Sequence, residues 1–348
     1  MGELSPNAEI ALKAQNQPLE AGTHPGQIRT RLYHIGHPPR DAQYQDWPNL
    51  CQDDENLLWI DITAPVDHQL THIGELLGID PRAIAIARRT NLRPSVRIYK
   101  DHYLVTAISV DVDETGHEPD MTITEINAVA GRNFLFTVHN RRLPFFEELE
   151  ERTATNPQIG RLDSSYLLYV LLDTLVADYA REFEEVEDEV ERLEEQLLRE
   201  TGRAALNQVM LMTRHIHLVR RIVAPHRHAF GVLVAADSPI PELQVDTYFR
   251  DLIARVDGLI EQLDHARAIA TGSYDLYISN ISHRTNQELR VLTYLSAVLL
   301  PMTVITGIFG TNFTLSEYEA WQPFYVMLGG MGMITVVMLL FFRWRQWL

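Results

Sequence analysis

Cysteine is almost absent from this sequence, since Cys51 is the only one among 348 residues. A single cysteine excludes an intramolecular disulfide and is typical of a protein kept in a reducing compartment. Residues 1–20 lack the basic start and apolar core of a cleaved signal peptide. The chain also has no phosphate-binding glycine loop, no dinucleotide glycine motif and no nucleophile elbow, so we do not expect an enzyme.

The 14 histidines do not form a zinc-binding pattern with cysteines, because the chain has no pair of cysteines. His215/His217 and His226/His228 are two residues apart, a spacing that puts the members of each pair on different faces of a helix. We therefore expect no tightly bound metal site and no cofactor. His139 follows a strand candidate, and we expect it to be packed or on the surface and not a catalytic base.

Positive charge is scarce. There are 30 Lys and Arg against 47 Asp and Glu, for a formal charge of −17. An acidic surface repels nucleic acid, which we do not expect as a partner, and concentrates cations. The net negative charge would also keep the cytoplasmic part soluble. Composition alone does not decide between attracting cations and providing solubility.

Two uncharged apolar runs lie at residues 291–316 and 320–342, separated by residues 317–319. Each reaches the roughly 20 residues that a helix needs to cross a bilayer core of about 30 Å. Two buried core helices are the alternative, but charges lie only at the ends of these runs. The sequence therefore predicts two membrane-spanning helices, with membrane lipid around them.

The charges flanking these spans predict their orientation. Arg284 and Arg290 precede the first span, Arg343 and Arg345 follow the second, and the connecting loop has no Lys or Arg. Because positive residues stay inside, both termini and the basic tail 343–348 should be cytoplasmic, in a cytoplasmic (inner) membrane. Two spans in one chain cannot enclose a pore, so conduction would need a ring of copies, most simply a cyclic homo-oligomer.

The part before the spans divides into a polar, flexible tail at 1–27, an α/β domain at 28–143 and a helical stalk at 144–290. Within the α/β domain the strand candidates are 57–62, 96–99, 103–110, 123–130 and 133–138, with a helix at 68–77 stopped by Gly78 and a turn at Gly131-Arg132.

The stalk begins with a coiled-coil pattern. Apolar residues alternate in steps of four and three, as on a packed helix face, at Leu172, Val176, Tyr179, Phe183, Val186, Val190, Leu193 and Leu197. Nine of the fifteen residues 181–195 are Asp or Glu, whereas the next helix, 203–233, is basic. This predicts an antiparallel hairpin with complementary charges. Gathering cations near a pore is the alternative use of the acidic run.

A second pattern keeps the same spacing at Leu252, Val256, Leu259, Leu263, Ala266 and Ala270. It continues without a turn cluster into the first span. We expect one helix from about 244 to 309, roughly 100 Å long at 1.5 Å per residue. Such a helix would carry a change in the cytoplasmic part to the membrane.

Polar residues recur along the first span at helical spacing. Asn286, Ser296, Thr303 and Gly310 fall near one face, with Leu289, Leu292 and Leu300 between them. In a ring of copies this face would line the axis, where leucine rings gate by dewetting and polar rings hold a hydrated ion. Ordinary helix packing also favours Ser, Thr and Gly, so the spacing alone leaves both interpretations open.

The end of this span, Gly-Ile-Phe-Gly-Thr-Asn-Phe at 307–313, resembles the Tyr-Gly-Met-Asn-Phe stretch of CorA-type magnesium channels. Its flanks are similar too: Arg-Thr-Asn at 284–286, Leu-Pro-Met-Thr at 300–303, and a final Trp-Leu. Upstream, Leu-Trp-Ile-Asp at 58–61 and Asn-Phe-Leu-Phe-Thr-Val-His at 133–139 look like two strands of that family.

The resemblance implies a funnel-shaped homopentamer that transports divalent cations, foremost Mg²⁺. The selectivity motif would be Gly310, Thr311 and Asn312, with Glu317 and Glu319 attracting cations outside it. The pore lining implied by spacing and resemblance together is Asp275, Asn286, Leu289, Leu292, Ser296, Leu300, Thr303 and Gly307. Mg²⁺ sheds water reluctantly, so asparagine oxygens suit its water shell.

The sequence departs from the family at two places. Thr311 replaces methionine and Phe309 replaces tyrosine, as happens in ZntB-type zinc transporters, so Zn²⁺, Co²⁺ and Ni²⁺ stay open beside Mg²⁺. The acidic pair of a regulatory metal site falls at Ala85 and Ile86, which predicts gating without magnesium feedback. Two alternatives follow: a CorA-derived scaffold that does not transport, and a two-helix anchor for a coiled-coil signalling module.

Overall fold

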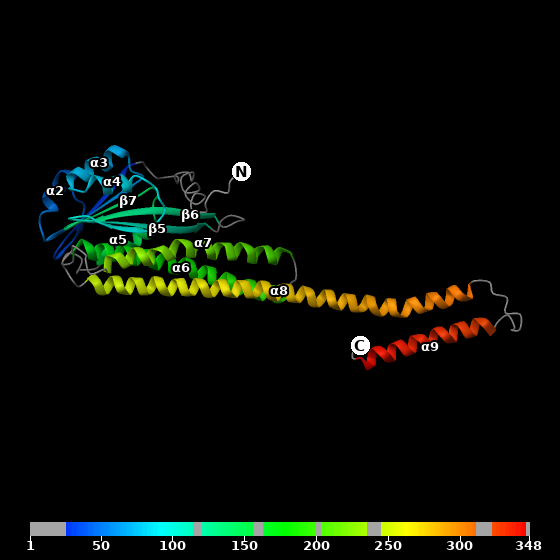
Figure 1. The fold of residues 1–348 in the computed structure, drawn as a ribbon. Coiled ribbons are helices and arrows are strands. Elements are labelled where there is room, and N and C mark those ends of the chain that lie inside the picture. Colours follow the sequence, from blue (N-terminus) through cyan, green and yellow to red (C-terminus); the bar gives the residue numbers. More distant parts are fainter. Residues whose placement is uncertain are drawn as a thin grey trace. The chain divides into compact units, whose positions relative to one another are not determined.

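The computed structural model describes residues 26–113, 120–155, 163–199, 203–234, 245–310 and 322–345. These residues belong to two compact units, shown in Figure 1. The first unit comprises Met1–Gln196 and Ala204–Gly272, and the second comprises Leu197–Arg203 and Ser273–Leu348. Residues 1–25 of the predicted tail lie outside the described part, and Gln27, which the prediction includes in that tail, begins a strand.

The first unit contains a sheet of seven strands in the order β2-β1-β3-β7-β6-β5-β4. The central strands β3 and β7 are parallel, with Leu58 opposite Phe134, and the other neighbours are antiparallel. All five predicted strands are present, and β1 and β2 are additional. The strands are β1 (Gln27–His34), β2 (His37–Arg40), β3 (Asn56–Thr63), β4 (Ser95–Ile98), β5 (Tyr103–Asp113), β6 (Asp120–Ala130) and β7 (Phe134–His139).

Helices cover both faces of the sheet (Figure 1). Because side chains alternate along a strand, Leu57 and Trp59 of β3 join one apolar cluster, and Leu58 and Ile60 join another. The second cluster is completed by short helices that precede β4: α2 (Trp47–Leu50), α3 (Asp67–Leu76) and α4 (Pro81–Ala87). A 3-10 turn, η1 (Tyr44–Asp46), leads into α2. Gly78 has a φ of +67° where the chain leaves α3, which explains why glycine ends this helix.

The other face of the sheet packs against long helices. They are α5 (Phe145–Thr155), α6 (Ser164–Arg199), α7 (Arg203–Val234) and the first part of α8 (Val245–Phe309). The seam predicted on α6 is buried from Leu172 to Leu193, and the seam predicted on α8 is buried from Leu252 to Ala270. The side chain of Leu197 lies outside the described part. The sheet and these helices share one continuous apolar cluster, so residues on both sides of Pro144 form a common core.

The charge pairing predicted for the α6–α7 hairpin is wrong for two arginines of α7. Arg220 Nε lies 2.6 Å from Asp264 Oδ1, and Arg227 pairs with Asp257. Both aspartates belong to α8, not to the acidic run of α6. The basic helix therefore finds its carboxylates on the helix that follows it, because α8 returns alongside α7.

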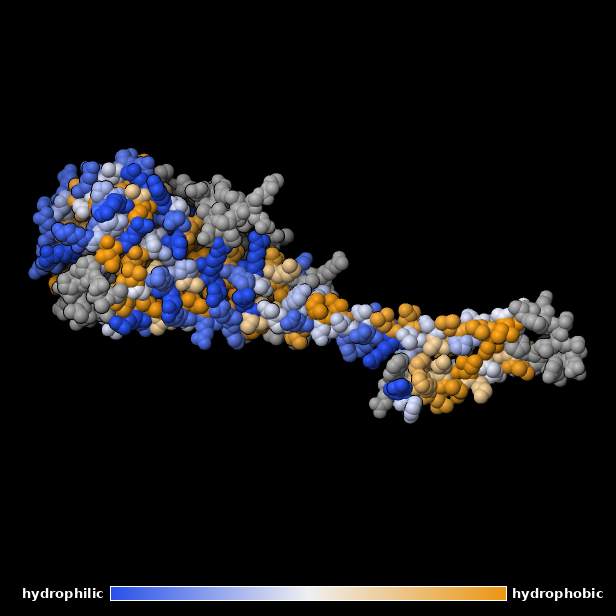
Figure 2. Space-filling model, viewed as in Figure 1, coloured by the Kyte–Doolittle hydropathy of each residue, from blue (hydrophilic) through white to orange (hydrophobic). Residues whose placement is uncertain are grey.

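The second unit contains the remainder of α8 and α9 (Gln322–Trp344). Both helices are long and apolar enough to cross a membrane, within Thr247–Ile308 and Phe324–Trp344. Figure 2 shows hydrophobic side chains gathered over both. Helix α8 spans 65 residues without interruption, as the sequence predicted to within one residue at its start. The protein is thus an α/β domain and a long helical segment followed by two C-terminal spans.

Candidate functional site

One face of α8 packs against α9 in the second unit. Tyr294 contacts Phe342, which is only 4% exposed, with ring centroids 4.9 Å apart. Along α8, half-buried side chains recur every three or four residues, as expected for one packed helix face. They are Tyr294, Ala297, Val298, Pro301, Met302 and Ile305. This face is used for pairing the two spans and cannot also line a pore.

The opposite face of α8 is open. Leu292 and Ser296 lie two residues on either side of Tyr294, which places them about 200° around the helix. Both are exposed, and so is every other residue that the sequence assigned to the pore. These residues are Asp275, Asn286, Leu289, Leu292, Ser296, Leu300, Thr303 and Gly307. The residues predicted to line a pore therefore lie outside the face that packs against α9, and their role in a pore stays a prediction.

The hydroxyl groups near the outer end of α8 are oriented by the helix itself. Thr303 Oγ1 donates a hydrogen bond to the Leu300 carbonyl at 2.8 Å, and Thr306 Oγ1 donates to the Met302 carbonyl at 3.0 Å. A hydroxyl that donates to its own helix keeps lone pairs for a second partner. Thr303 can therefore accept hydrogen bonds from the water shell of a cation on the open face.

Only the first residue of the selectivity motif lies in the described part. Gly310 follows the last turn of α8, where its N–H donates to the Thr306 carbonyl at 2.8 Å. A Cβ at this position would lie 3.1 Å from that carbonyl oxygen, tight enough to favour glycine. Thr311, Asn312, Glu317 and Glu319 lie outside the described residues, and their roles remain predictions.

The two upstream strands of the family resemblance are joined by buried polar groups. Trp59 Nε1 donates to Thr137 Oγ1 at 3.1 Å, and Thr137 donates to Asp61 Oδ1 at 2.6 Å. The His139 Nε2 atom lies 3.0 Å from the same carboxylate oxygen. Burial lowers the pKa of His139, but the Asp61 carboxylate outweighs it, and the net pKa is raised. His139 is packed, as predicted, and ties β7 to β3.

A second buried histidine fastens the sheet to the helices. His226 Nε2 accepts a hydrogen bond from the Ile108 N–H at 3.0 Å, and Nδ1 lies 2.9 Å from the Ile222 carbonyl. Tyr179 of α6 donates its hydroxyl to the Ile108 carbonyl beside it. Burial lowers the pKa of His226 to about 4, so the ring is neutral and Nε2 can accept. No local pattern predicted this contact, because its partners are far apart in the chain.

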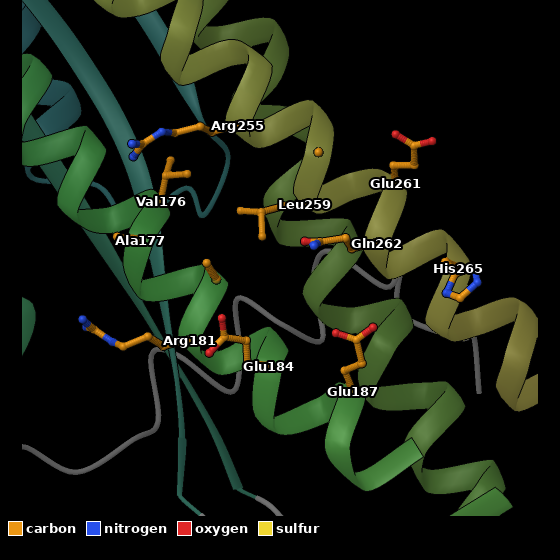
Figure 3. Close-up of a pocket in the computed structure, with 12 residues that line it drawn as sticks. Val176, Ala177, Arg181, Glu184, Glu187, Arg255, Leu259, Glu261, Gln262 and His265 are labelled. Carbon is orange, nitrogen blue, oxygen red and sulfur yellow. The ribbon is translucent and has the colours of Figure 1, made fainter. Parts of the chain in front are cut away.

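A groove of about 790 Å³ lies between α6 and α8 of the first unit (Figure 3). Its acidic residues Glu184, Glu187 and Glu261 come from the two helices. Its arginines are engaged with carboxylates beyond the groove: Arg181 with Glu148 and Asp178, and Arg255 with Asp173 and Asp251. In the described part of the chain, no three His, Cys, Asp or Glu residues are grouped to hold a metal ion.

The positions of the regulatory acidic pair lie on α4. Ala85 is exposed, and Ile86 packs partly against the apolar cluster between the sheet and α3. The nearby Arg88 lies 3.6 Å from the Asp67 carboxylate and donates to the Asp67 carbonyl at 3.2 Å. Neither position thus carries a side-chain oxygen that could bind a metal, and the nearby Arg88 already contacts α3.

One histidine spacing on α3 does suit metal ligation. His68 and His72 are one helical turn apart and share a face, which the sequence interpretation overlooked. The His72 ring packs near Tyr44, with centroids 5.7 Å apart. No third ligand joins them among the described residues.

Comparison with known proteins gives one consistent result. Residues 54–344 match the family described as CorA-like Mg²⁺ transporter protein. The chain is 28% identical over 300 residues to the cobalt/magnesium transport protein CorA of Thermotoga maritima, with 85% of each chain covered. It is 25% identical over 224 residues to the zinc transport protein ZntB of Yersinia enterocolitica, covering 64% of this chain and 66% of that one.

The fold shows the same similarity. The complete structure of the CorA magnesium transporter from Methanocaldococcus jannaschii superposes with a TM-score of 0.73 at 21% identity. The match covers 91% of this chain and 98% of that chain. The α/β unit, the long helix and the two apolar C-terminal helices are therefore a shared architecture.

Proposed function

The chain belongs to the CorA-like Mg²⁺ transporter family, and we propose that it conducts divalent cations across the membrane through a pore lined by α8. The observation that carries this proposal is the open face of α8 opposite α9, where polar and leucine residues alternate. A face of α8 that does not pack against α9 is available to a neighbouring copy or to the pore axis. Exposed leucines can then close the pore by dewetting.

The assembly is proposed to be a homopentamer with both termini in the cytoplasm. Family membership supports the ring, and the arginines flanking the spans support the orientation. Conduction would also need several associated copies, because α8 and α9 of one chain cannot surround an axis.

Selection is proposed to act on the hydrated ion. Asn312 at the outer mouth would offer a side-chain oxygen to coordinated water without adding a fixed charge. Mg²⁺ suits this mechanism best, because it retains water more firmly than other common divalent ions. Thr311 in place of methionine keeps Zn²⁺, Co²⁺ and Ni²⁺ as further candidates, and the similarity to a ZntB protein supports testing zinc.

Gating is proposed to be independent of internal magnesium. Ala85 and Ile86 supply no carboxylate on α4, so a metal has no acidic ligand at these two positions. The same observation favours one other function, a membrane scaffold that has lost transport. A scaffold would keep the fold and the assembly but would not depend on the polar residues of the pore face.

Ion flux into liposomes containing the purified full-length protein tests the proposal. Mg²⁺ and Zn²⁺ influx are compared for wild type, Asn312→Ala and a matched control, Asn207→Ala, whose exposed side chain lies on α7 of the first unit. We expect flux that is lost or loses ion preference only in Asn312→Ala. Absence of flux for both ions, from protein shown to be an intact oligomer, would support the scaffold instead.

A further inference from the structure

Two arginines, Arg290 and Arg345, lie toward the cytoplasmic end of the α8–α9 pair. Arg290 lies one turn before Tyr294 on α8, and Arg345 lies one turn after Phe342 on α9. Because residues three or four apart share a helix face, each arginine is on the side of the Tyr294–Phe342 ring contact. The 4.9 Å contact therefore brings both guanidinium groups to the same end of the same helix pair.

These arginines lack a protein counter-ion in the part of the chain that the structure describes. Arg290, Arg343 and Arg345 are exposed and make no ion pair there. Glu288 is the nearest carboxylate along α8, but it lies two residues from Arg290 and thus about 200° around the helix. Like charges gathered at one place repel, and an anion bound between them would remove that repulsion.

The residues around these arginines are of the kinds found at the headgroup level of a bilayer. Trp344 is 76% exposed, and its ring centroid lies 6.5 Å from that of Phe341. An exposed tryptophan at the end of a span is typical of the headgroup level of a bilayer. On the turn of α9 that precedes it, Leu339 and Leu340 are 49% and 62% exposed, which offers an apolar surface for acyl chains.

We propose that Arg290 and Arg345, with Arg343 and Trp344, form a binding site for the phosphate of an anionic phospholipid in the cytoplasmic leaflet. A guanidinium group binds phosphate oxygens in a bidentate manner, and basic pockets between spans hold anionic headgroups. The lipid bridges the ends of α8 and α9 and fixes the second span against the first. This inference requires the two spans but does not require transport.

Native mass spectrometry of the full-length protein in neutral detergent tests the site. Phosphatidylglycerol is added alone or with an equal concentration of inorganic phosphate, phosphatidylcholine is added in a separate sample, and the bound lipid molecules are counted per chain. The variant carries Arg290→Gln with Arg345→Gln. A control of equal charge change carries Arg89→Gln with Arg93→Gln, because these arginines are exposed in the first unit. A third protein, Arg290→Lys with Arg345→Lys, keeps both charges and checks that a loss of binding reflects charge and not misfolding.

We expect phosphatidylglycerol to bind the wild type, the control and the lysine variant. The glutamine variant should bind it about thirtyfold more weakly, as follows from losing two basic residues at a membrane surface. Equal binding by the glutamine variant, or equal binding of phosphatidylcholine to the wild type, would overturn the proposal. Competition by inorganic phosphate at equal concentration would show a soluble-anion site instead of a lipid site.

Discussion

Tyr294 of α8 and Phe342 of α9 pack ring against ring, with centroids 4.9 Å apart and ring planes at 55°. This contact fixes the rotation of α8 relative to α9. With Tyr294 turned toward α9, Leu292 and Ser296 point away from it and remain exposed. The choice of packing face thereby determines which face of α8 is free for a pore.

The ring contact should be energetically coupled. We expect Tyr294→Ala and Phe342→Ala each to destabilise the protein, with a coupling of about 0.5–1.5 kcal/mol beyond lost apolar burial. A double-mutant cycle on unfolding of the detergent-solubilised protein measures it. Strictly additive effects would show that the two rings do not interact.

Internal magnesium should not close the pore. Because Ala85 and Ile86 carry no carboxylate, millimolar Mg²⁺ inside liposomes should leave the initial influx unchanged. The measurement compares influx of a tracer cation into vesicles preloaded with Mg²⁺ or with a matched monovalent salt. Strong closure by the preloaded Mg²⁺ would mean that other residues form a regulatory site.

Acid should destabilise the first unit through His226. Its folded pKa of about 4 lies below the ordinary value of 6.5, so the unfolded state takes up the proton first as pH falls. The contribution of neutral His226 to the free energy of unfolding is complete above pH 6.5. It decreases toward pH 4, by on the order of 3 kcal/mol. Unfolding of wild type and His226→Gln across this range should show a flatter pH dependence in the variant. Parallel curves would contradict the assignment.

Removal of the Thr137 hydroxyl should be costly although valine has nearly the same shape. Thr137 is fully buried and accepts the Trp59 Nε1–H while donating to Asp61. Thr137→Val leaves that indole donor unpaired, and we expect a loss of about 1–3 kcal/mol in the free energy of unfolding. Thr71→Val is the control, because Thr71 is exposed on α3. An equal loss of unfolding free energy in both variants would argue against the buried network.

Much of the fold follows from local sequence pattern. The apolar run at 57–62 and the three-four spacing from Leu252 to Ala270 predicted β3 and the buried face of α8, because such periods reflect burial directly. Strand β2 was missed because it contains two prolines and lies at a sheet edge, where few side chains are buried. Charge was a poorer guide, since it predicted that α6 would supply carboxylates to α7, whereas Arg220 and Arg227 of α7 pair with aspartates of α8.

For the candidate site too, the sequence predicted the features that depend on local periodicity and not the contacts between distant segments. Helical periodicity predicted a polar face on α8, and its role in a pore stays a prediction, while the structure adds that α9 packs on the other side. The links from His226 to Ile108 and from His139 to Asp61 join residues more than 70 positions apart. Such contacts depend on how the sheet and helices pack, and no single segment of sequence encodes them.

Cysteine substitution tests the pore face most directly. The only native thiol, Cys51, is half-buried, and burial raises its pKa to about 12, so it reacts weakly. Ser296→Cys places a thiol on the open face, and Leu295→Cys places one about 100° away on the same helix. A water-soluble, charged thiol reagent is applied to liposomes while Mg²⁺ or Zn²⁺ flux is recorded.

We expect the reagent to abolish flux through Ser296→Cys and to leave flux through Leu295→Cys and the wild type unchanged. Block at Leu295→Cys with undiminished flux at Ser296→Cys would contradict the proposed pore, because the conducting face of α8 would then not be the one opposite α9.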